Sequence, residues 1–170
     1  IQAVNDPPTI VVPGPQTTCE STAHQLPYHS ITVQDPDIPS FREAGLELAV
    51  SFSAQLGKLE AATTPPTAAA AVLQFRGTPS ACNAFAANLT YHPPAPNTDS
   101  SAEVIEDRIS VMVNDLGNTG PGPALSSSAE VRVTVLAINE APSIVYSGLT
   151  GSAANATANI TVLEDTPFTL

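Results

Sequence analysis

Apolar residues alternate with other residues along three stretches of this chain, and the alternation limits the fold more than any other feature. Leu, Ile, Val or Phe occupies every second position in residues 46–52, 109–113 and 131–135. A period of two places successive side chains on opposite faces of an extended chain, so one face can be buried while the other meets water. The pattern therefore predicts β-strands that each have one buried face.

Shorter apolar runs lie between these stretches and are separated from them by turn-forming residues. They cover residues 31–33, 72–75 and 89–91, with clusters of Pro, Gly, Asn and Asp between them. The sequence QLGKLEA at residues 55–61 predicts a hairpin that turns at its glycine. Seven or eight strands at this spacing predict an all-β sandwich.

Two segments depart from the strand pattern. TPSACNAFAANL at residues 78–89 places helix-forming residues behind a Thr-Pro start, which predicts one short helix before the strand at 89–91. TTPPTAAAA at residues 63–71 contains prolines that exclude a central strand, and we interpret it as a loop.

Two similar phrases indicate an internal repeat. IQAVNDPPTI opens the chain, and VLAINEAPSI begins at residue 135, so that Ala137 follows Ala3 by 134 positions. A second pair, CEST at residues 19–22 and LEDT at 163–166, follows in the same order but at a longer spacing, which an inserted surface loop explains. We therefore expect a linker at residues 1–8, a complete repeat at 9–136, a linker at 137–142 and the start of the next repeat at 143–170.

Composition excludes some partners and favours others. The formal net charge of −11 argues against binding to nucleic acid, whose phosphates require a basic surface, and makes cations natural partners. Only 12% of the residues are charged, and 17 are proline, which suits a secreted surface of Ser, Thr, Ala and Pro. No apolar run is long enough to span a membrane, so we expect no membrane insertion in this segment.

Cysteines and glycosylation sequons point to export. Cys19 and Cys82 lie 63 positions apart, far from the spacing of a metal or redox motif, and we predict that they form a disulfide; two buried thiols are the alternative. Three Asn-x-Thr sequons predict glycans on Asn88, Asn155 and Asn159. Together these features favour an extracellular or cell-surface location.

The order of several motifs resembles the cadherin-like tandem repeats of large extracellular surface proteins and adhesins. The matching pieces are AVNDPP and AINEAP as linkers, CEST and LEDTPFTL as the acidic first-strand motif, ITVQDPD at a strand end, LQFRG and NLTYHP in mid-domain, and DRISVMVNDLGNTGPG with VRVTVLAINEAP at the end. The resemblance covers the whole chain. It implies a seven-stranded Greek-key sandwich of the Ig-like type, with calcium between consecutive domains.

The resemblance also implies which residues would bind that calcium. They are Asn5 and Asp6 in the first linker, Asp35, Asp37, Asp115 and Glu20 in the domain, and Asn139 and Glu140 in the second linker. Calcium binds six to eight oxygens in flexible geometry, and carboxylates at strand ends can supply them. The first five acidic and amide positions should converge at one end of the domain, and Glu20 with the second linker at the other. The alternative is that these side chains only stabilise turns.

Nothing in the sequence forms a catalytic motif. His24, His29 and His92 are not accompanied by a nucleophile signature. We interpret the carboxylates of Glu103, Glu106 and Asp107 as a solvated approach to a strand rather than an acid and base pair. We therefore expect that this chain is not an enzyme.

Three functions follow in order of preference. The first is a structural repeat of a long glycosylated fibre or rod, such as a cell-surface or flagellar hair, whose partners are neighbouring repeats of the same chain, other fibre or cell-surface proteins and glycans. The second is an adhesin repeat that binds a sugar or a protein. The third is an accessory domain of a secreted enzyme. The absence of tryptophan leaves little aromatic surface for sugar stacking, which favours the first.

Overall fold

The computed structural model describes residues 4–27, 30–39, 43, 45–63, 67–94, 104–117 and 121–138. The chain divides into two compact units, Ile1–Asn139 and Glu140–Leu170, and the division falls inside the expected linker at 137–142. All the described residues belong to the first unit.

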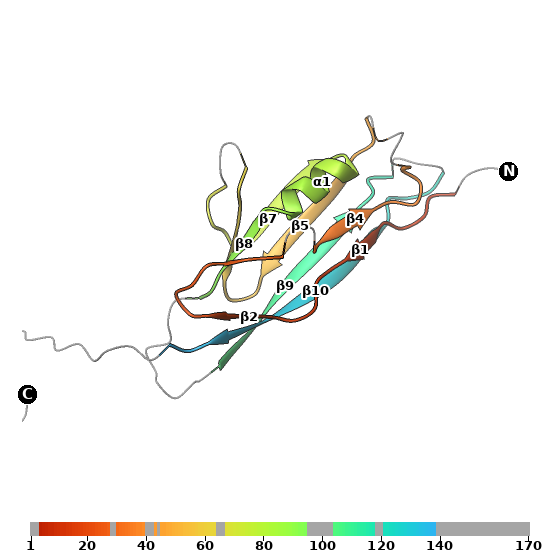
Figure 1. Ribbon diagram of the computed structural model, residues 1–170. Helices are drawn as coiled ribbons and strands as arrows, with labels where there is room; N and C mark the ends of the chain where they lie inside the picture. The colour runs from red at the N-terminus through yellow and green to blue at the C-terminus, as the bar shows by residue number, and fades with distance from the viewer. Residues whose placement is uncertain are drawn as a thin grey trace, which may run out of the picture. The chain divides into compact units, whose positions relative to one another are not determined.

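The described residues form ten strands and one helix (Figure 1). The elements are β1 (Thr9–Val11), β2 (Gln16–Cys19), β3 (His24–Gln25), β4 (Thr32–Gln34), β5 (Leu48–Ala54), β6 (Lys58–Ala61), β7 (Val72–Gly77), α1 (Pro79–Ala86), β8 (Leu89–His92), β9 (Val104–Asn114) and β10 (Ser126–Leu136). They make a five-stranded sheet in the order β2-β10-β9-β5-β7, a three-stranded sheet β3-β8-β6 and a two-stranded sheet β1-β4. This is a mostly β fold with several sheets, consistent with the expected all-β sandwich.

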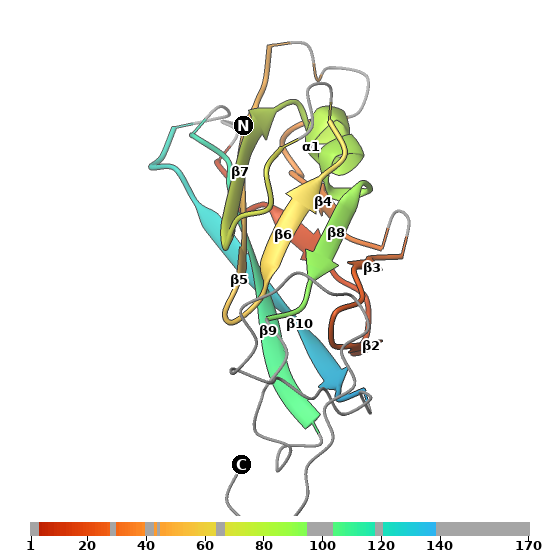
Figure 2. The ribbon, with the colours of Figure 1, turned by 90° about the vertical axis from the view of Figure 1, so that its left-hand side faces the viewer.

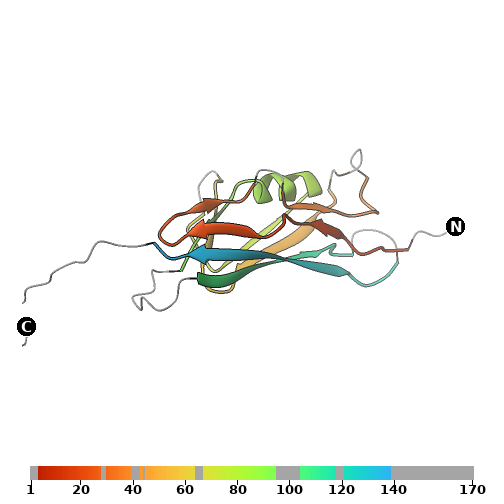
Figure 3. The same cartoon turned by 60° about the horizontal axis from the view of Figure 1, so that its bottom comes forward.

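A long antiparallel hairpin of β9 and β10 forms the centre of the five-stranded sheet (Figure 3). The alternation seen in the sequence appears here as alternating burial: Val131, Val133 and Val135 are at most 1% exposed, while the residues between them face outward. On the edge of this sheet, β2 runs parallel to the last part of β10. β2 therefore lies beside the part of β10 through which the chain leaves the domain.

One hydrophobic core joins all three sheets to the helix. In Figure 2 the three-stranded sheet and α1 lie over the five-stranded sheet. The core is built from Leu26, Ile31, Val33, Ile38, Leu48, Val50, Phe52, Ala54, Leu59, Ala61, Leu73, Cys82, Phe85, Ala86, Leu89, Tyr91, Ile109, Val111, Val113, Val131, Val133 and Val135. Each fully buried aliphatic side chain of this kind contributes about 1.5–3 kcal/mol relative to exposure.

The predicted short helix is confirmed as α1. Thr78 is its N-cap and accepts a hydrogen bond from Ala81 N through its hydroxyl, and Pro79 occupies the first turn, where a missing N–H is tolerated. Phe85 stacks between Phe75 and Phe52, with ring centroids 4.7 Å and 5.9 Å apart, which fixes the helix against β7 and β5.

Two expectations about the strands are wrong. The described part of the chain holds ten strands rather than seven or eight, because short strands at residues 9–11, 16–19 and 24–25 have no apolar period. QLGKLEA is not a hairpin, since β5 pairs with β7 and β9 while β6 pairs with β8. Its turn carries the chain from one sheet to another instead.

The only helix among the residues with defined positions is α1, and it is too short and insufficiently apolar to cross a membrane.

Candidate functional site

Two strand ends and the N-terminal segment bring five of the predicted ligand residues together. Asp35 and Asp37 follow the end of β4, and Asp115 follows the end of β9. Asn5 and Asp6 precede β1, which pairs with β4. We call these five residues the linker cluster. Their expected convergence at one end of the domain is therefore found, and it arises because antiparallel pairing sets the start of β1 beside the end of β4.

Asn5 fastens the linker to the turn between β9 and β10. Its side-chain amide donates to Asp115 Oδ2 at 2.7 Å and to the carbonyl oxygen of Pro123 at 3.1 Å. The side chain is 6% exposed, although the residue precedes the first strand. A buried amide that donates to an ionised carboxylate makes a stronger bond than a neutral pair does. Asn5 is thus a specific attachment point rather than a loose tether.

Asp115 is held by a tight turn. Its Oδ1 accepts from the backbone amides of Gly117 and Leu125, both at 2.8 Å. Leu116 and Gly117 have positive φ angles of 58° and 66°, which permit this turn. Burial by itself would raise the pKa of Asp115, but these two amides and Asn5 together hold that pKa below its ordinary value. Asp115 is therefore a fixed anion at the linker end.

Asp35 and Asp37 extend the same hydrogen-bond network, in which one carboxylate oxygen of Asp35 has no partner. Asp37 Oδ2 accepts from Asp6 N at 2.7 Å, and Asp35 Oδ1 accepts from Asp37 N at 2.8 Å. Asp35 is 4% exposed, and its Oδ2 has no hydrogen-bond partner. Burial, and then the nearby charges of Asp37, Asp115 and Asp6, raise the pKa of Asp35 above its ordinary value. A buried carboxylate oxygen without a partner is costly and favours a bound cation or donor.

Glu20 performs the corresponding attachment at the opposite end of the domain. Its Oε1 accepts from Ile138 N at 2.8 Å, just beyond the end of β10, and its backbone N donates to the carbonyl oxygen of Leu136 at 2.9 Å. Glu20 is 6% exposed. The chain is therefore held by a carboxylate where it leaves the domain, as it is by Asp115 where it enters. Asn139 and Glu140 lie outside the described residues.

The oxygen-bearing side chains of the linker cluster are of the kind that calcium binds, but they are not yet close enough together to hold an ion. It supplies four carboxylates and an amide, and the unpartnered Asp35 Oδ2 is the kind of hard oxygen that calcium binds. No group of three or more His, Cys, Asp or Glu side chains is placed to hold a metal ion within the described ranges. Binding would require the carboxylates to draw closer and Asn5 to turn its oxygen toward the ion.

The predicted disulfide is wrong, since Cys19 and Cys82 are both free. Cys19 on β2 pairs with Leu136 on β10, which in turn pairs with Val104 at the start of β9. Cys82 Sγ lies 3.8 Å from the carbonyl oxygen of Leu48, beside the opposite end of β9 at Asn114. Ten residues of strand separate these ends, about 33 Å at 3.3 Å per residue. A disulfide joins Cα atoms only about 4.4–6.8 Å apart.

We expect the two thiols to differ in reactivity. Cys19 is partly exposed, whereas Cys82 is 1% exposed and burial raises the pKa of its thiol to about 11. Since the thiolate is the reactive form, a disulfide reagent at pH 8 should label Cys19 within minutes and Cys82 only after denaturant is added. Mass spectrometry of the labelled peptides measures both rates. If neither cysteine were labelled until a reductant was added, the two would be bonded and the predicted disulfide would be correct.

Asn88 is the one predicted glycosylation site among the described residues. It lies between α1 and β8, partly exposed, and its side-chain amide donates to Ala84 O at 2.8 Å. A glycosylated asparagine keeps one amide hydrogen, so this bond is compatible with the modification. Asn155 and Asn159 lie outside the described residues, and glycans at all three sites stay a prediction.

A buried carboxylate that we interpreted as solvated holds two sheets together. Asp107 is 1% exposed and accepts from Leu56 N at 3.0 Å, Gly57 N at 2.9 Å and the hydroxyl of Tyr91 at 2.6 Å. Tyr91 is fully buried, and burial, followed by the bond to Asp107, raises the pKa of its hydroxyl. The sequence already indicated that Asp107 points inward, because it is in phase with the buried residues Ile109 and Val111.

Two of the three histidines, His24 and His92, are among the described residues and lie on the paired strands β3 and β8. His92 Nε2 lies 2.8 Å from Glu60 Oε2, and His24 Nε2 lies 3.4 Å from Gln16 Oε1, so each has a polar neighbour on a sheet surface. His29 and Glu103 lie outside the described residues. Glu106 accepts from Thr134 on the exposed face of the sheet.

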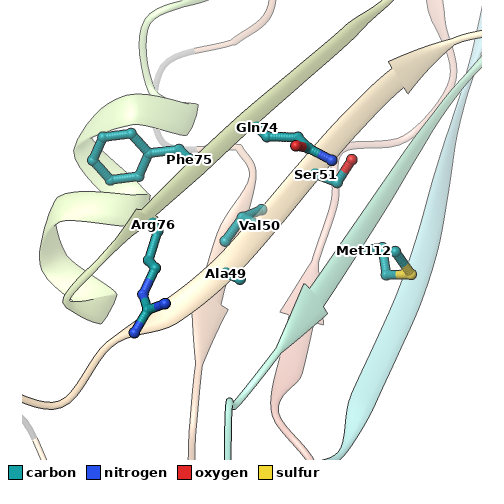
Figure 4. A pocket seen from close by; sticks show the side chains of 7 residues that line it. All are labelled: Ala49, Val50, Ser51, Gln74, Phe75, Arg76 and Met112. Carbon is teal, nitrogen blue, oxygen red and sulfur yellow. The ribbon is translucent and has the colours of Figure 1, made fainter.

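A shallow pocket of about 350 Å³ on the outer face of the five-stranded sheet has no reactive side chain (Figure 4). Gln74 extends over Ser51, Met112 lies on the far side, and Phe75 turns toward α1. Arg76, the one charged residue of its lining, is paired with Glu47 at 2.6 Å. The linker cluster is therefore the better candidate for function.

Comparisons with models of protein families, with curated proteins and with solved structures each found no match.

Proposed function

We propose that this chain is a structural repeat of an extracellular fibre or rod, in which each linker is held by the domains on both sides of it. The cadherin-like Greek-key type belongs to the same proposal, and the mostly β fold with β2 parallel to β10 supports it. The domain would act through its two ends, where Asp115 and Glu20 each hold a residue of a linker.

A single observation carries this proposal: consecutive linker positions attach to opposite ends of the domain. Ile138 N binds Glu20 at the exit, while the amide of Asn5 binds Asp115 at the entrance. Val4 and Asn5 correspond to Ile138 and Asn139 in the repeated phrase. In a tandem array, one linker residue would bind the domain before it and the next residue the domain after it. Such a linker has little freedom to bend.

We further propose that calcium binds the linker cluster and tightens the junction. Four carboxylates repel one another when close, and a divalent cation removes the repulsion and uses the unpartnered oxygen of Asp35. Asp35, Asp37 and Asp115 would hold the ion from the domain, with Asn5 and Asp6 from the linker. Without the ion, the hydrogen bonds of Asn5 and Asp6 would hold the linker alone.

A binding module of the adhesin type is the alternative, and an accessory domain of a secreted enzyme is the third possibility. The pocket of Figure 4 has no exposed aromatic ring on which a sugar could stack, which weighs against a sugar-binding adhesin. Glycans on the partly exposed Asn88 would suit a cell-surface location.

A two-repeat chain tests the junction directly. Residues 1–136 followed by a second copy from residue 3 onward recreate the linker between two complete domains. We expect calcium to raise its melting temperature by several degrees and to narrow its distribution of lengths in small-angle scattering, compared with chelator.

An Asp35→Ala, Asp37→Ala double variant in the second copy is the test of position, and Glu130→Ala, on the outer sheet face, is its matched control. The double variant should lose the response to calcium, and the control should keep it. If calcium and chelator give the same curves for the unaltered chain, the ion proposal fails. If the two domains also scatter as freely jointed bodies, the rod proposal fails with it.

A further inference from the structure

The outer face of the five-stranded sheet is open, because the three-stranded sheet and α1 lie over its inner face (Figure 2). Met112 on this face is 53% exposed, and the side chains of Arg108 and Glu130 are 58% and 53% exposed. Asn88, the predicted glycosylation site between α1 and β8, belongs to the covered side. A glycan on Asn88 would therefore leave the outer sheet face free for another molecule.

The outer sheet face differs in charge from the rest of the domain. Three of the four Lys and Arg residues in the described ranges lie on it beside three carboxylates, and these six residues are Arg76, Arg108, Arg132, Glu47, Glu106 and Glu130. The face is therefore neutral, whereas the remaining described residues carry one lysine against eight acidic residues, a net charge of −7. Two copies of the domain that met through that remaining surface would bring like charges together.

Arg132 on β10 lies in an unfavourable electrostatic position. It is directly opposite Arg108 on β9, and like charges opposite each other in an antiparallel pair destabilise a sheet. Arg108 has Glu130 at 3.7 Å, but Arg132 has no ion pair or side-chain hydrogen bond within the described part of the chain. A carboxylate from outside the domain would relieve the repulsion between the two arginines.

A second copy of the domain can supply that carboxylate from β10 itself. Glu130 and Arg132 are two positions apart, so both side chains point outward and are separated by about 7 Å along the strand. A two-fold axis that lies between two facing sheets and crosses β10 at a right angle between these residues exchanges their positions. It sets Arg132 of each copy opposite Glu130 of its partner, so that one contact makes two ion pairs.

The size of the face suits a weak dimer. β9 and β10 are each 11 residues long, which corresponds to about 36 Å, and five strands make the sheet about 19 Å wide. Since β2 and β7 are shorter, the flat area is at most about 700 Å², just below the roughly 800 Å² that each partner buries in an interface of standard size. Met112 and the pocket of Figure 4 provide apolar surface on the same face.

We propose that the outer sheet face is a lateral docking surface for a second copy of this chain, in a two-fold arrangement with Arg132 opposite Glu130. This contact goes beyond the end-to-end rod, because it joins domains side by side. In a fibre it would bundle neighbouring chains, while the acidic remainder of each domain stays in contact with water.

Sedimentation equilibrium of the full chain tests the proposal. We expect a monomer–dimer equilibrium between about 10 μM and about 1 mM, because the face is polar and of modest area. Added salt should weaken the dimer, since its ion pairs lie near solvent.

Charge exchanges assign the association to this face. Arg132→Glu and Glu130→Arg should each raise the dissociation constant of the dimer about tenfold or more, since each sets like charges opposite each other. The double variant, and an equimolar mixture of the two single variants, should recover dimerisation, because every arginine at these positions again faces a glutamate. Lys58→Glu on the three-stranded sheet is the matched control, since it changes the net charge as Arg132→Glu does and should leave the constant unchanged.

Three results would overturn the proposal. They are a chain that stays monomeric over the whole range, equal weakening by Arg132→Glu and Lys58→Glu, and failure of both the double variant and the mixture to recover dimerisation. A monomeric chain that a heparin column retains through Arg132 would identify an anionic polysaccharide as the occupant instead of a second copy.

The lateral contact and the calcium junction fail separately. Dimerisation depends on protein concentration, whereas stiffening of the two-repeat chain by calcium is measured in dilute solution, where the lateral dimer is dissociated. Glu130→Ala therefore remains a valid control for the calcium response.

Discussion

Replacing Asp107 by alanine should lower the free energy of unfolding by about 4 kcal/mol, because it removes one buried acceptor from several donors at once. The amides of Leu56 and Gly57 and the hydroxyl of Tyr91 would lose their partner in a site that is 1% exposed. Urea unfolding followed by circular dichroism measures the change.

Glu106→Ala is the matched control for this prediction. Glu106 is the preceding residue on β9, but its carboxylate lies on the exposed face, where it accepts from Thr134. Its removal should cost less than about 0.5 kcal/mol. Tyr91→Phe should fall between the two, at about 1–2 kcal/mol, since it removes one donor and keeps the ring. Equal losses for Asp107→Ala and Glu106→Ala would show that the buried network contributes nothing.

The second large effect is expected at Gly57, where a methyl group has no space. A Cβ atom built there would lie 2.5 Å from the carbonyl oxygen of His92 and 2.6 Å from the ring of Tyr91. The first of these is backbone and cannot rotate away. Gly57→Ala should therefore cost about 3 kcal/mol, as overpacking of a core does, and should also strain the bond from Gly57 N to Asp107.

Gly14 provides the comparison, because a Cβ atom there would meet nothing within 4 Å and the backbone has no positive φ angle. Gly14→Ala should leave stability unchanged or raise it by a few tenths of a kcal/mol through the unfolded chain. The same urea experiment measures both. A Gly57→Ala protein as stable as Gly14→Ala would contradict the close approach of β8 to the turn after β5.

The features that could be predicted from the sequence are those with a local cause. The alternation around Val131 and Val133 predicted β10, because every second residue from Val131 to Val135 is buried. Thr78 and Pro79 predicted the start of α1, because capping involves only neighbouring residues. The convergence of Asp35 and Asp115 has a different source, because it is expected from the resemblance to cadherin-like repeats and not from a local pattern.

The features that could not be predicted depend on pairing between distant segments. The polar residues of β2 form a strand only because β10 lies beside them. The paired residues Gln16 and Val133 are 117 positions apart in the chain. The separation of Cys19 and Cys82 is likewise set by strand register and not by their spacing in the chain. The inward position of Asp107 was visible in the phase of β9, but its partners on β8 and in the turn after β5 were not.

The parallel pairing of β2 with β10 determines how the domain would respond to tension. A pull on the two linkers draws β10 toward its end and, once β1 has separated from β4, draws β2 toward its start, so that β2 and β10 slide along each other. Under such shear, the bonds along the four paired residues of β2 are loaded together and must break together, whereas an antiparallel hairpin pulled from its open end unzips one pair at a time. A filament assembled from such domains would resist stretching until a threshold force and then lengthen in discrete steps.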